Sequence, residues 1–197
     1  MRDVKGNRII GFGDSITFGS CVEPHENWLS LLSDYIKTRS EYEGVEVFNA
    51  GIGGNTSREG MARYDQDVKP HLPGIVIIEF GGNDAVNDPQ RHLTLDEFDT
   101  IIRQIVRKVR NGKGEPVIMT FPPVIDEWHG TFGDTFYDEY GGCDGYIELY
   151  REITRNLAKE LGCRLIDLDK EIRMQMKKQG KESMILPDGV HLTVQGN

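Results

Sequence analysis

Short apolar runs that alternate with stretches of helical period constrain the fold of this chain most strongly. Five runs rich in β-branched residues are predicted as buried strands: 8–13, 45–50, 74–80, 116–121 and 163–168. Between them, apolar side chains recur at three- and four-residue steps, as in amphipathic helices, in residues 27–38, 95–110 and 145–161. This alternation predicts an α/β protein with a five-stranded parallel sheet and helices on both faces. The functional crevice of such a sheet lies at the carboxyl ends of its strands.

Composition restricts the classes of binding partner and the cellular location that are expected for this chain. A chain of 197 residues with 38% hydrophobic residues fits one domain. The net charge of -9, without a basic cluster, argues against nucleic acid and anionic membrane surfaces as partners. No apolar run approaches the roughly 20 residues that a membrane span needs. The N-terminal residues lack a secretory signal pattern, and the three cysteines are scattered, so a cytoplasmic location is predicted.

The loop after the first predicted strand, "GDSITFGS" (13–20), admits two interpretations. The dinucleotide pattern G-x-G-x-x-G fails at its third glycine, and the nucleotide-binding pattern G-x-x-x-x-G-K-[ST] is absent. The hydroxyls of Ser15, Thr17 and Ser20 fit a flavin phosphate at a helix N-terminus. Alternatively, Ser15 is a nucleophile. A flavin-binding electron carrier and an enzyme therefore both remain open on this loop alone.

A second loop, "PDGVHL" (187–192), favours the nucleophile. It places Asp188 three residues before His191. A serine hydroxyl needs a base to take its proton, and an imidazole serves best when a carboxylate fixes its tautomer. Ser15, His191 and Asp188 supply these three groups, on loops that belong to the same edge of the predicted sheet.

Two further strand-end loops offer hydrogen-bond donors for an oxyanion. The glycines of "NAGIGGNTS" (49–57) let backbone N–H groups approach a ligand closely, and the side chain of Asn83 in "FGGNDA" (80–85) carries an amide. Each feature alone also fits an ordinary turn or helix cap. Together, serine, glycines, asparagine and an Asp/His pair follow the strands in an order that one acyl-transfer site can use.

At this point the sequence resembles the GDSL-like, or SGNH, hydrolase family. The resemblance is carried by four short blocks spread over nearly the whole chain: "GFGDSITFG" (11–19), "NAGIGGNTS" (49–57), "EFGGNDA" (79–85) and "PDGVHLT" (187–193). It implies that Ser15 is the nucleophile, with His191 and Asp188 as its partners. It also implies an oxyanion hole formed by the backbone N–H groups of Ser15 and Gly54 and by the Asn83 side chain. Asp14 and Asp84 would fix loops rather than exchange protons.

The resemblance implies one flavodoxin-like, three-layer α/β/α domain over residues 1–197. In the family a further helix usually follows the histidine block and covers the sheet. Here only six residues follow His191, and "LTVQGN" (192–197) resembles the start of that helix. We therefore expect a domain that lacks its C-terminal helix, or a homo-oligomer in which a neighbouring subunit covers the exposed face.

The substrate wall is predicted in residues 122–145, a connection longer than usual loops and rich in aromatic residues. Candidate wall residues are Trp128, Phe132, Phe136 and Tyr137; the alternative is that they form a satellite cluster beneath the loop. His129 has no second histidine at ligand spacing, so no metal site is predicted.

These observations predict a serine hydrolase that cleaves a carboxylic ester through an acyl-enzyme, without a cofactor. The expected substrate is a small-molecule or glycan ester, in particular a short-chain acetyl ester of a carbohydrate. A lysophospholipase or an acyl-thioesterase is the alternative within the family. The flavin-binding electron carrier is the alternative from a different class.

Overall fold

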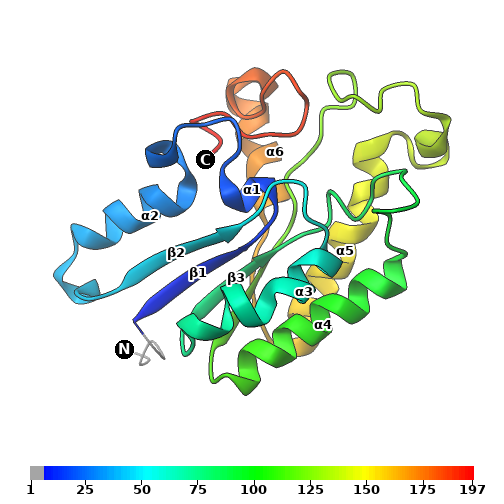
Figure 1. Ribbon diagram of the computed structural model, residues 1–197. Helices are drawn as coiled ribbons and strands as arrows, with labels where there is room; N and C mark the ends of the chain where they lie inside the picture. Colours follow the sequence, from blue (N-terminus) through cyan, green and yellow to red (C-terminus); the bar gives the residue numbers. More distant parts are fainter. Residues whose placement is uncertain (1–6) are drawn as a thin grey trace.

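The computed structural model, which describes residues 7–197, contains a five-stranded parallel sheet (Figure 1). Its strands are β1 (Arg8–Gly13), β2 (Glu46–Gly51), β3 (Ile75–Glu79), β4 (Glu115–Met119) and β5 (Arg164–Ile166). They lie in the order β2-β1-β3-β4-β5, and every neighbouring pair is parallel. This is the flavodoxin-like order, so the predicted fold class is confirmed.

The three predicted helices are present, and the described chain has three further α-helices. The predicted helices are α2 (Trp28–Lys37), α4 (Leu95–Asn111) and α5 (Cys143–Leu161); the others are α3 (Ser57–Asp67), α6 (Leu168–Gln179) and the single turn α1 (Ser15–Phe18). Short 3-10 turns lie at Pro24–Glu26, Ser40–Tyr42, Lys69–His71, Thr135–Tyr140 and Lys181–Ser183. In the described part of the chain, no helix combines the length and apolar character of a membrane span.

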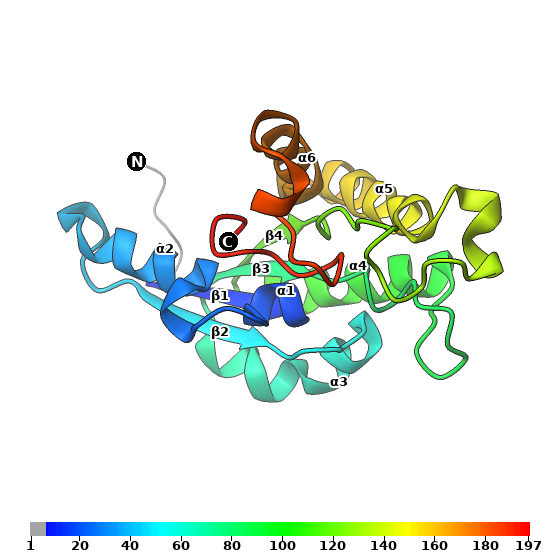
Figure 2. The same cartoon turned by 90° about the horizontal axis from the view of Figure 1, so that it is seen from above.

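The helices form a layer on each side of the sheet. α3, α4 and α5 lie on one side, and α2 lies on the other, with α6 beside the β5 edge (Figure 2). The main core contains alternate strand residues such as Ile10, Val76 and Ile118 together with the apolar faces of α4 and α5. The intervening strand residues, among them Ile77 and Val117, form a smaller cluster on the α2 side. Both faces of the central strands are therefore buried, as continuous apolar strand sequences require.

The strand register brings four loops together at one edge of the sheet. Gly13, at the end of β1, lies beside Gly51 of β2 and Glu79 of β3, and Glu79 lies beside Met119 of β4. A side chain at Gly13 would collide with the Thr17 hydroxyl and with the Glu79 backbone, which explains the glycine. The loops after β1, β2, β3 and β4 thus start at the same level.

The last residues described, 193–197, form a hydrogen-bonded turn. The N–H of Asn197 donates to the carbonyl of Thr193 at 3.0 Å. The helix expected from residue 192 onward stays a prediction.

Candidate active site

The loop after β1 presents Ser15 at the crevice. A carboxylate oxygen of Asp14 accepts a hydrogen bond from the N–H of Ile16 at 2.9 Å and so caps α1. The helix ends after one turn at Gly19, whose φ of 79° favours glycine. Ser15 is consequently the first residue of a single helical turn that directly follows a buried strand. The buried strand before it and the capped turn after it fix its position.

Ser15, His191 and Asp188 form a continuous chain of polar contacts. Ser15 Oγ lies 3.0 Å from His191 Nε2, and His191 Nδ1 lies 2.7 Å from Asp188 Oδ2. In this order of hydroxyl, imidazole and carboxylate, the imidazole is placed to accept the hydroxyl proton while the carboxylate holds its tautomer. The fold thus brings together two loops that are 176 positions apart in sequence.

Asp188 is held in its charged form by its own turn. Burial alone would raise the pKa of this carboxyl, but hydrogen bonds from the N–H of Val190 and from His191 outweigh burial and keep the pKa below its usual value. Oδ1 accepts the N–H of Val190 at 2.9 Å and that of His191 at 3.0 Å. Gly189, with a φ of 78°, permits the tight turn between them. Oδ2 is left to face the imidazole.

The backbone N–H groups of Ser15 and Gly54 belong to residues that line the same cavity. Gly54 lies in the glycine-rich loop after β2 and has a φ of 78°, a conformation that a side chain would strain. Within the described chain, neither its N–H nor that of Ser15 has a protein acceptor. Unpaired N–H groups beside a hydroxyl are what an oxyanion needs.

Asn83 is positioned by contacts on all sides of its amide. Nδ2 donates to Asp14 Oδ2 at 3.0 Å and to the carbonyl of Asn55 at 3.1 Å, while Oδ1 accepts from the guanidinium of Arg91. Arg91 also donates to the carbonyl of Gly54 at 2.9 Å. Both amide hydrogens already have acceptors, so a bound oxyanion would compete with Asn55 for one of them. No motif in the sequence indicates Arg91.

The buried carboxyl groups of Asp14 and Glu79 lie next to each other at the start of the loop after β1. Burial raises the pKa of Asp14 to about 7 and that of Glu79 well above its usual value. Both oxygens of Asp14 accept N–H bonds, from Ile16 and Asn83, which favours its charged form. Glu79 accepts the hydroxyl of Thr17 at 2.9 Å and otherwise faces Asp14, whose charge raises the pKa of Glu79 further. We therefore assign the shared proton to Glu79.

Asp84 ties two of the strand-end loops together. It lies in the loop after β3 and accepts hydrogen bonds from the N–H and the hydroxyl of Ser57, the first residue of α3. Burial raises the pKa of Asp84 to about 6, and the bonds from Ser57 oppose that rise. Asp84 therefore connects the loop after β3 to the start of α3.

A cavity of about 580 Å³ opens beside Ser15 and His191. One part of its wall is apolar and consists of Val86, Phe121, Val124, Cys143, Ile147 and Val190. The polar part includes Arg91, Asn83 and the backbone of Gly53 and Gly54. A larger hollow, about 990 Å³, lies at β5 and α6, away from these groups. The mixed wall next to the hydroxyl suits a small ligand with one apolar and one polar end.

The connection after β4 contributes to this wall through residues other than the predicted aromatics. His129, Gly130 and Thr131 line the cavity, and the ring of His129 contacts the hydroxyl of Thr131. Burial lowers the pKa of His129, so its ring is neutral near pH 7. His129 is therefore part of the cavity wall.

The four aromatic candidates lie elsewhere, and in the described chain none lines the cavity. Phe132 is 70% exposed, and Trp128 packs beside the core with Lys181 over its ring. Phe136 and Tyr137 pack against each other and against Tyr146 of α5, as in the satellite cluster considered above. These rings face α5 because the 3-10 turn that carries Phe136 and Tyr137 folds back onto that helix.

With this geometry in place, comparison with known proteins identifies the family. Residues 12–197 match the model of the GDSL-like Lipase/Acylhydrolase family. The chain belongs to this family. It is accordingly a hydrolase of the esterase and acylhydrolase type, which confirms the resemblance in the four sequence blocks.

Relatives in the GDSL-like family differ in what they act on. The chain is 29% identical over 209 residues to the uncharacterized lipoprotein YqeF of Bacillus subtilis, across 95% of this chain and 84% of that protein. It is 31% identical over 119 residues to Escherichia coli Thioesterase 1/protease 1/lysophospholipase L1, across 60% of this chain and about half (53%) of that protein. The solved structure of an acetylxylan esterase from Geobacillus stearothermophilus superposes with a TM-score of 0.77 at 23% identity, across 100% of this chain and 91% of the other. The predicted cytoplasmic location stays a prediction, since one of these relatives is a lipoprotein.

The flavin alternative conflicts with both the family and the loop. Thr17, one of the three hydroxyls expected around a phosphate, is fully buried and donates to Glu79. The carboxylate of Asp14 lies at the start of the same turn, where it would oppose a phosphate dianion. The loop after β1 therefore fits a GDSL-like hydrolase and does not fit an electron carrier.

Proposed function

We propose that this GDSL-like protein is a carboxylic ester hydrolase with Ser15 as its nucleophile, His191 as its general base and Asp188 as the carboxylate that orients His191. The observation that carries this proposal is the unbroken contact chain, 3.0 Å from Ser15 Oγ to His191 Nε2 and 2.7 Å from His191 Nδ1 to Asp188 Oδ2. A donor on Nδ1 leaves the Nε2 lone pair free to accept the serine proton.

The reaction then proceeds in two halves. Ser15 Oγ attacks the ester carbonyl carbon while its proton passes to His191 Nε2. The C–O bond to the alcohol breaks, the alcohol leaves with that proton, and an acyl-enzyme remains. Water then attacks the acyl carbon, with His191 again taking a proton and returning it to Ser15 Oγ as the acid leaves.

The negative oxygen of each tetrahedral intermediate would be stabilised by three donors. These are the N–H groups of Ser15 and Gly54 and the amide of Asn83, which would exchange its contact with the Asn55 carbonyl for the oxyanion. Loss of one such donor typically lowers kcat by about 10²–10³-fold.

A short acyl group on a small alcohol or sugar is the proposed substrate. The apolar patch inside a cavity of about 580 Å³ accommodates an acetyl or slightly longer acyl group, and the polar rim around Arg91 and His129 suits a hydroxylated alcohol. The acetylxylan esterase structure supports this choice. A lysophospholipase or thioesterase activity is the alternative, supported by the Escherichia coli relative.

The test is steady-state hydrolysis of p-nitrophenyl esters, from acetyl to octanoyl, by the wild type and by Ser15→Ala. We expect fastest turnover on the acetyl ester and a loss of at least about 10³-fold in the variant. The rate of the variant also gives the background from the slow direct reaction of surface imidazoles with the acetyl ester. Equal rates for wild type and variant would refute the serine mechanism, and a maximum at octanoyl would favour the lysophospholipase or thioesterase alternative.

A further inference from the structure

Cys21 lies close to the imidazole and carboxylate that the proposed reaction uses. It follows α1 by three residues and is exposed, with a φ of 73°. Its thiol, a carboxylate oxygen of Asp188 and a ring nitrogen of His191 all lie within 4.8 Å of one another. The thiol of Cys21 is free, since this cysteine is not part of a disulfide. The loop after β1 thus holds a free sulfur ligand beside a nitrogen and an oxygen ligand.

Sulfur, imidazole nitrogen and carboxylate oxygen are the ligands that Zn²⁺ takes in proteins, and three of them leave one position for water. At bond lengths of about 2.0–2.3 Å, ligand atoms around a tetrahedral zinc ion lie roughly 3–4 Å apart. The ligand atoms of Cys21, Asp188 and His191 lie within 4.8 Å of one another, which leaves a gap of up to roughly 1–2 Å relative to that spacing. Cys21 is exposed and the side chain of Asp188 is 43% exposed, so small side-chain rotations can close it.

We propose that Cys21, Asp188 and His191 bind Zn²⁺ reversibly and that the bound ion blocks hydrolysis at Ser15. Binding by the three ligands is independent of the reaction, whereas the block rests on the proposed function. The thiol proton of Cys21 is released to solvent when its thiolate binds the ion, with no change in oxidation state.

The ion blocks the reaction at whichever ring nitrogen it binds. At Nε2 it occupies the lone pair that must accept the Ser15 proton. At Nδ1 it replaces the proton shared with Asp188, so the tautomer that leaves Nε2 as acceptor is no longer fixed by the carboxylate. Hydrolysis and zinc binding therefore compete for the side chain of His191. Cys21 strengthens zinc binding and takes no part in hydrolysis.

The binding test uses Co²⁺ in place of Zn²⁺, because a cobalt–thiolate bond gives a charge-transfer absorption in the near ultraviolet. Titration of Co²⁺ into the wild type should give this band, and added Zn²⁺ should remove it. Cys21→Ser should give no band. Cys163→Ser is the matched control, since this half-buried thiol lies near Arg110 just before the amino end of β5, and it should keep the band. A band that persists in Cys21→Ser overturns the site.

The inhibition test measures hydrolysis of p-nitrophenyl acetate at buffered free Zn²⁺. Cys21→Ser should keep the basal rate and need at least about tenfold more Zn²⁺ for half inhibition than the wild type or Cys163→Ser. A chelator should restore the wild-type rate. Equal sensitivity of all three proteins overturns the block. A Cys21-dependent cobalt band in a protein that hydrolyses no ester would leave the metal site standing while the proposed function, and the block with it, fails.

Discussion

Arg91 is the residue through which the structure adds most to the candidate site. Its guanidinium donates both to the side-chain oxygen of Asn83 and to the carbonyl of Gly54, so one side chain positions two of the three proposed oxyanion donors. It lines the cavity, and its hydrogen bonds go to Gly54 and Asn83. We interpret Arg91 as a positioning residue, because its contacts fix the groups that would touch the developing negative charge.

Replacing Arg91 should therefore slow turnover more than it weakens binding. Arg91→Ala releases the amide of Asn83 to rotate, and we expect kcat on p-nitrophenyl acetate to fall by about tenfold or more while KM changes little. Arg91→Lys, which keeps a donor of the same charge, should recover part of the loss. Arg58→Ala removes an exposed cation paired with Glu97 and should leave both constants unchanged.

A different division of the effect between kcat and KM would assign Arg91 another role. If Arg91→Ala raised KM at constant kcat, Arg91 would contact the substrate instead of positioning the oxyanion donors. Steady-state constants for the four proteins on one neutral ester distinguish these outcomes.

The residues of the proposed triad could be predicted from the sequence because Ser15 follows a strand end, and because the Asp188 and His191 block resembles a known family pattern. Arg91 could not be predicted, since it reaches Asn83 through a loop whose path no periodicity describes. The packing of the aromatic candidates could not be predicted for a similar reason: composition suggested a substrate wall, whereas Phe136 packs on Tyr146 of α5. Side-chain direction in long connections depends on tertiary contacts.

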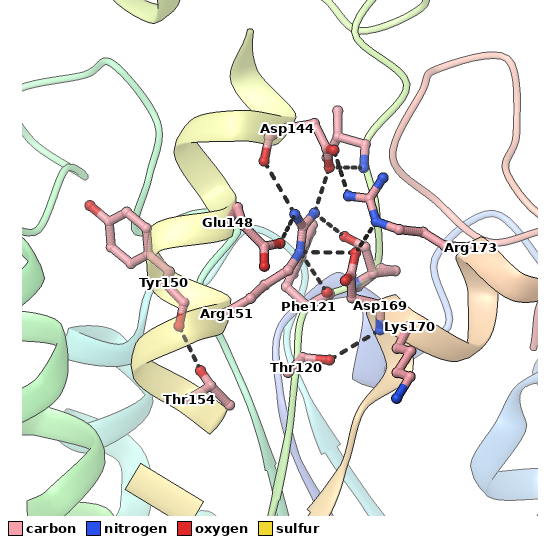
Figure 3. A network of polar contacts seen from close by, with 12 residues as sticks. Thr120, Phe121, Asp144, Glu148, Tyr150, Arg151, Thr154, Asp169, Lys170 and Arg173 are labelled. Carbon is pink, nitrogen blue, oxygen red and sulfur yellow. Dashed lines mark hydrogen bonds and ion pairs between the residues drawn. The ribbon is translucent and has the colours of Figure 1, made fainter. Parts of the chain in front are cut away.

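At the scale of elements, α5 fixes one wall of the cavity through a buried arginine. The side chain of Arg151 is fully buried; it donates to the carbonyls of Phe121 and Pro122 at 3.0 and 2.7 Å and pairs with Asp144 at 2.7 Å. Figure 3 shows this network, which continues to Asp169 of α6. Phe121 lines the cavity, so α5 and α6 hold the segment after β4 in place by charged hydrogen bonds.

Removal of Arg151 should destabilise the whole domain. Arg151→Ala leaves Asp144 and two carbonyls without their buried donor, which typically costs about 3–5 kcal/mol of unfolding free energy. Arg151→Lys keeps the charge but loses the forked geometry and should cost less. Arg164→Ala removes a surface pair with Glu115 and should cost at most about 1 kcal/mol. Urea unfolding measures all three, and equal small losses would show that the network is not stabilising.

The helices differ in how clearly the sequence predicts them. α2, α4 and α5 were predicted because their apolar residues recur with helical spacing. α3 was missed because it is mostly polar, although Thr56 and Glu59 form a capping box that marks its start. Arg151 lies on the same face of α5 as Ile147 and Thr154, and this charged residue within an apolar stripe was a signal of a buried ion pair.

For the molecule as a whole, alternation of strands and helices was enough to predict the sheet and its layers, since both faces of the central strands had to be covered. The proposed substrate, the location and the extent of the domain at its C-terminus stay predictions, because they depend on chemistry beyond the sheet. The burial of Glu79 could not be predicted from the hydrophobic pattern of the sequence. It ends an otherwise apolar strand, and only the packed structure shows that it is fully buried against Asp14.

This buried pair predicts how stability depends on pH. Because burial raises the pKa of Asp14 to about 7 and that of Glu79 well above its usual value, the folded state holds more protons than the unfolded chain above about pH 4. The pair's contribution to stability is therefore full below that pH and is lost as the pH rises through 7. Carboxyl groups with a lowered pKa, such as Asp144, act in the opposite sense only at lower pH.

Glu79→Gln isolates this effect. Its amide can donate to Asp14 as the protonated carboxyl does, and its oxygen can still accept the hydroxyl of Thr17, so the fold should be retained. Wild-type unfolding free energy should fall by at least about 1 kcal/mol between about pH 5 and pH 8, whereas that of the variant should change less. Asp34→Asn, at an exposed carboxylate, should follow the wild type. A variant slope equal to the wild-type slope in urea unfolding would mean that the pair does not share a proton, and the wild-type loss would then belong to another group such as Asp84.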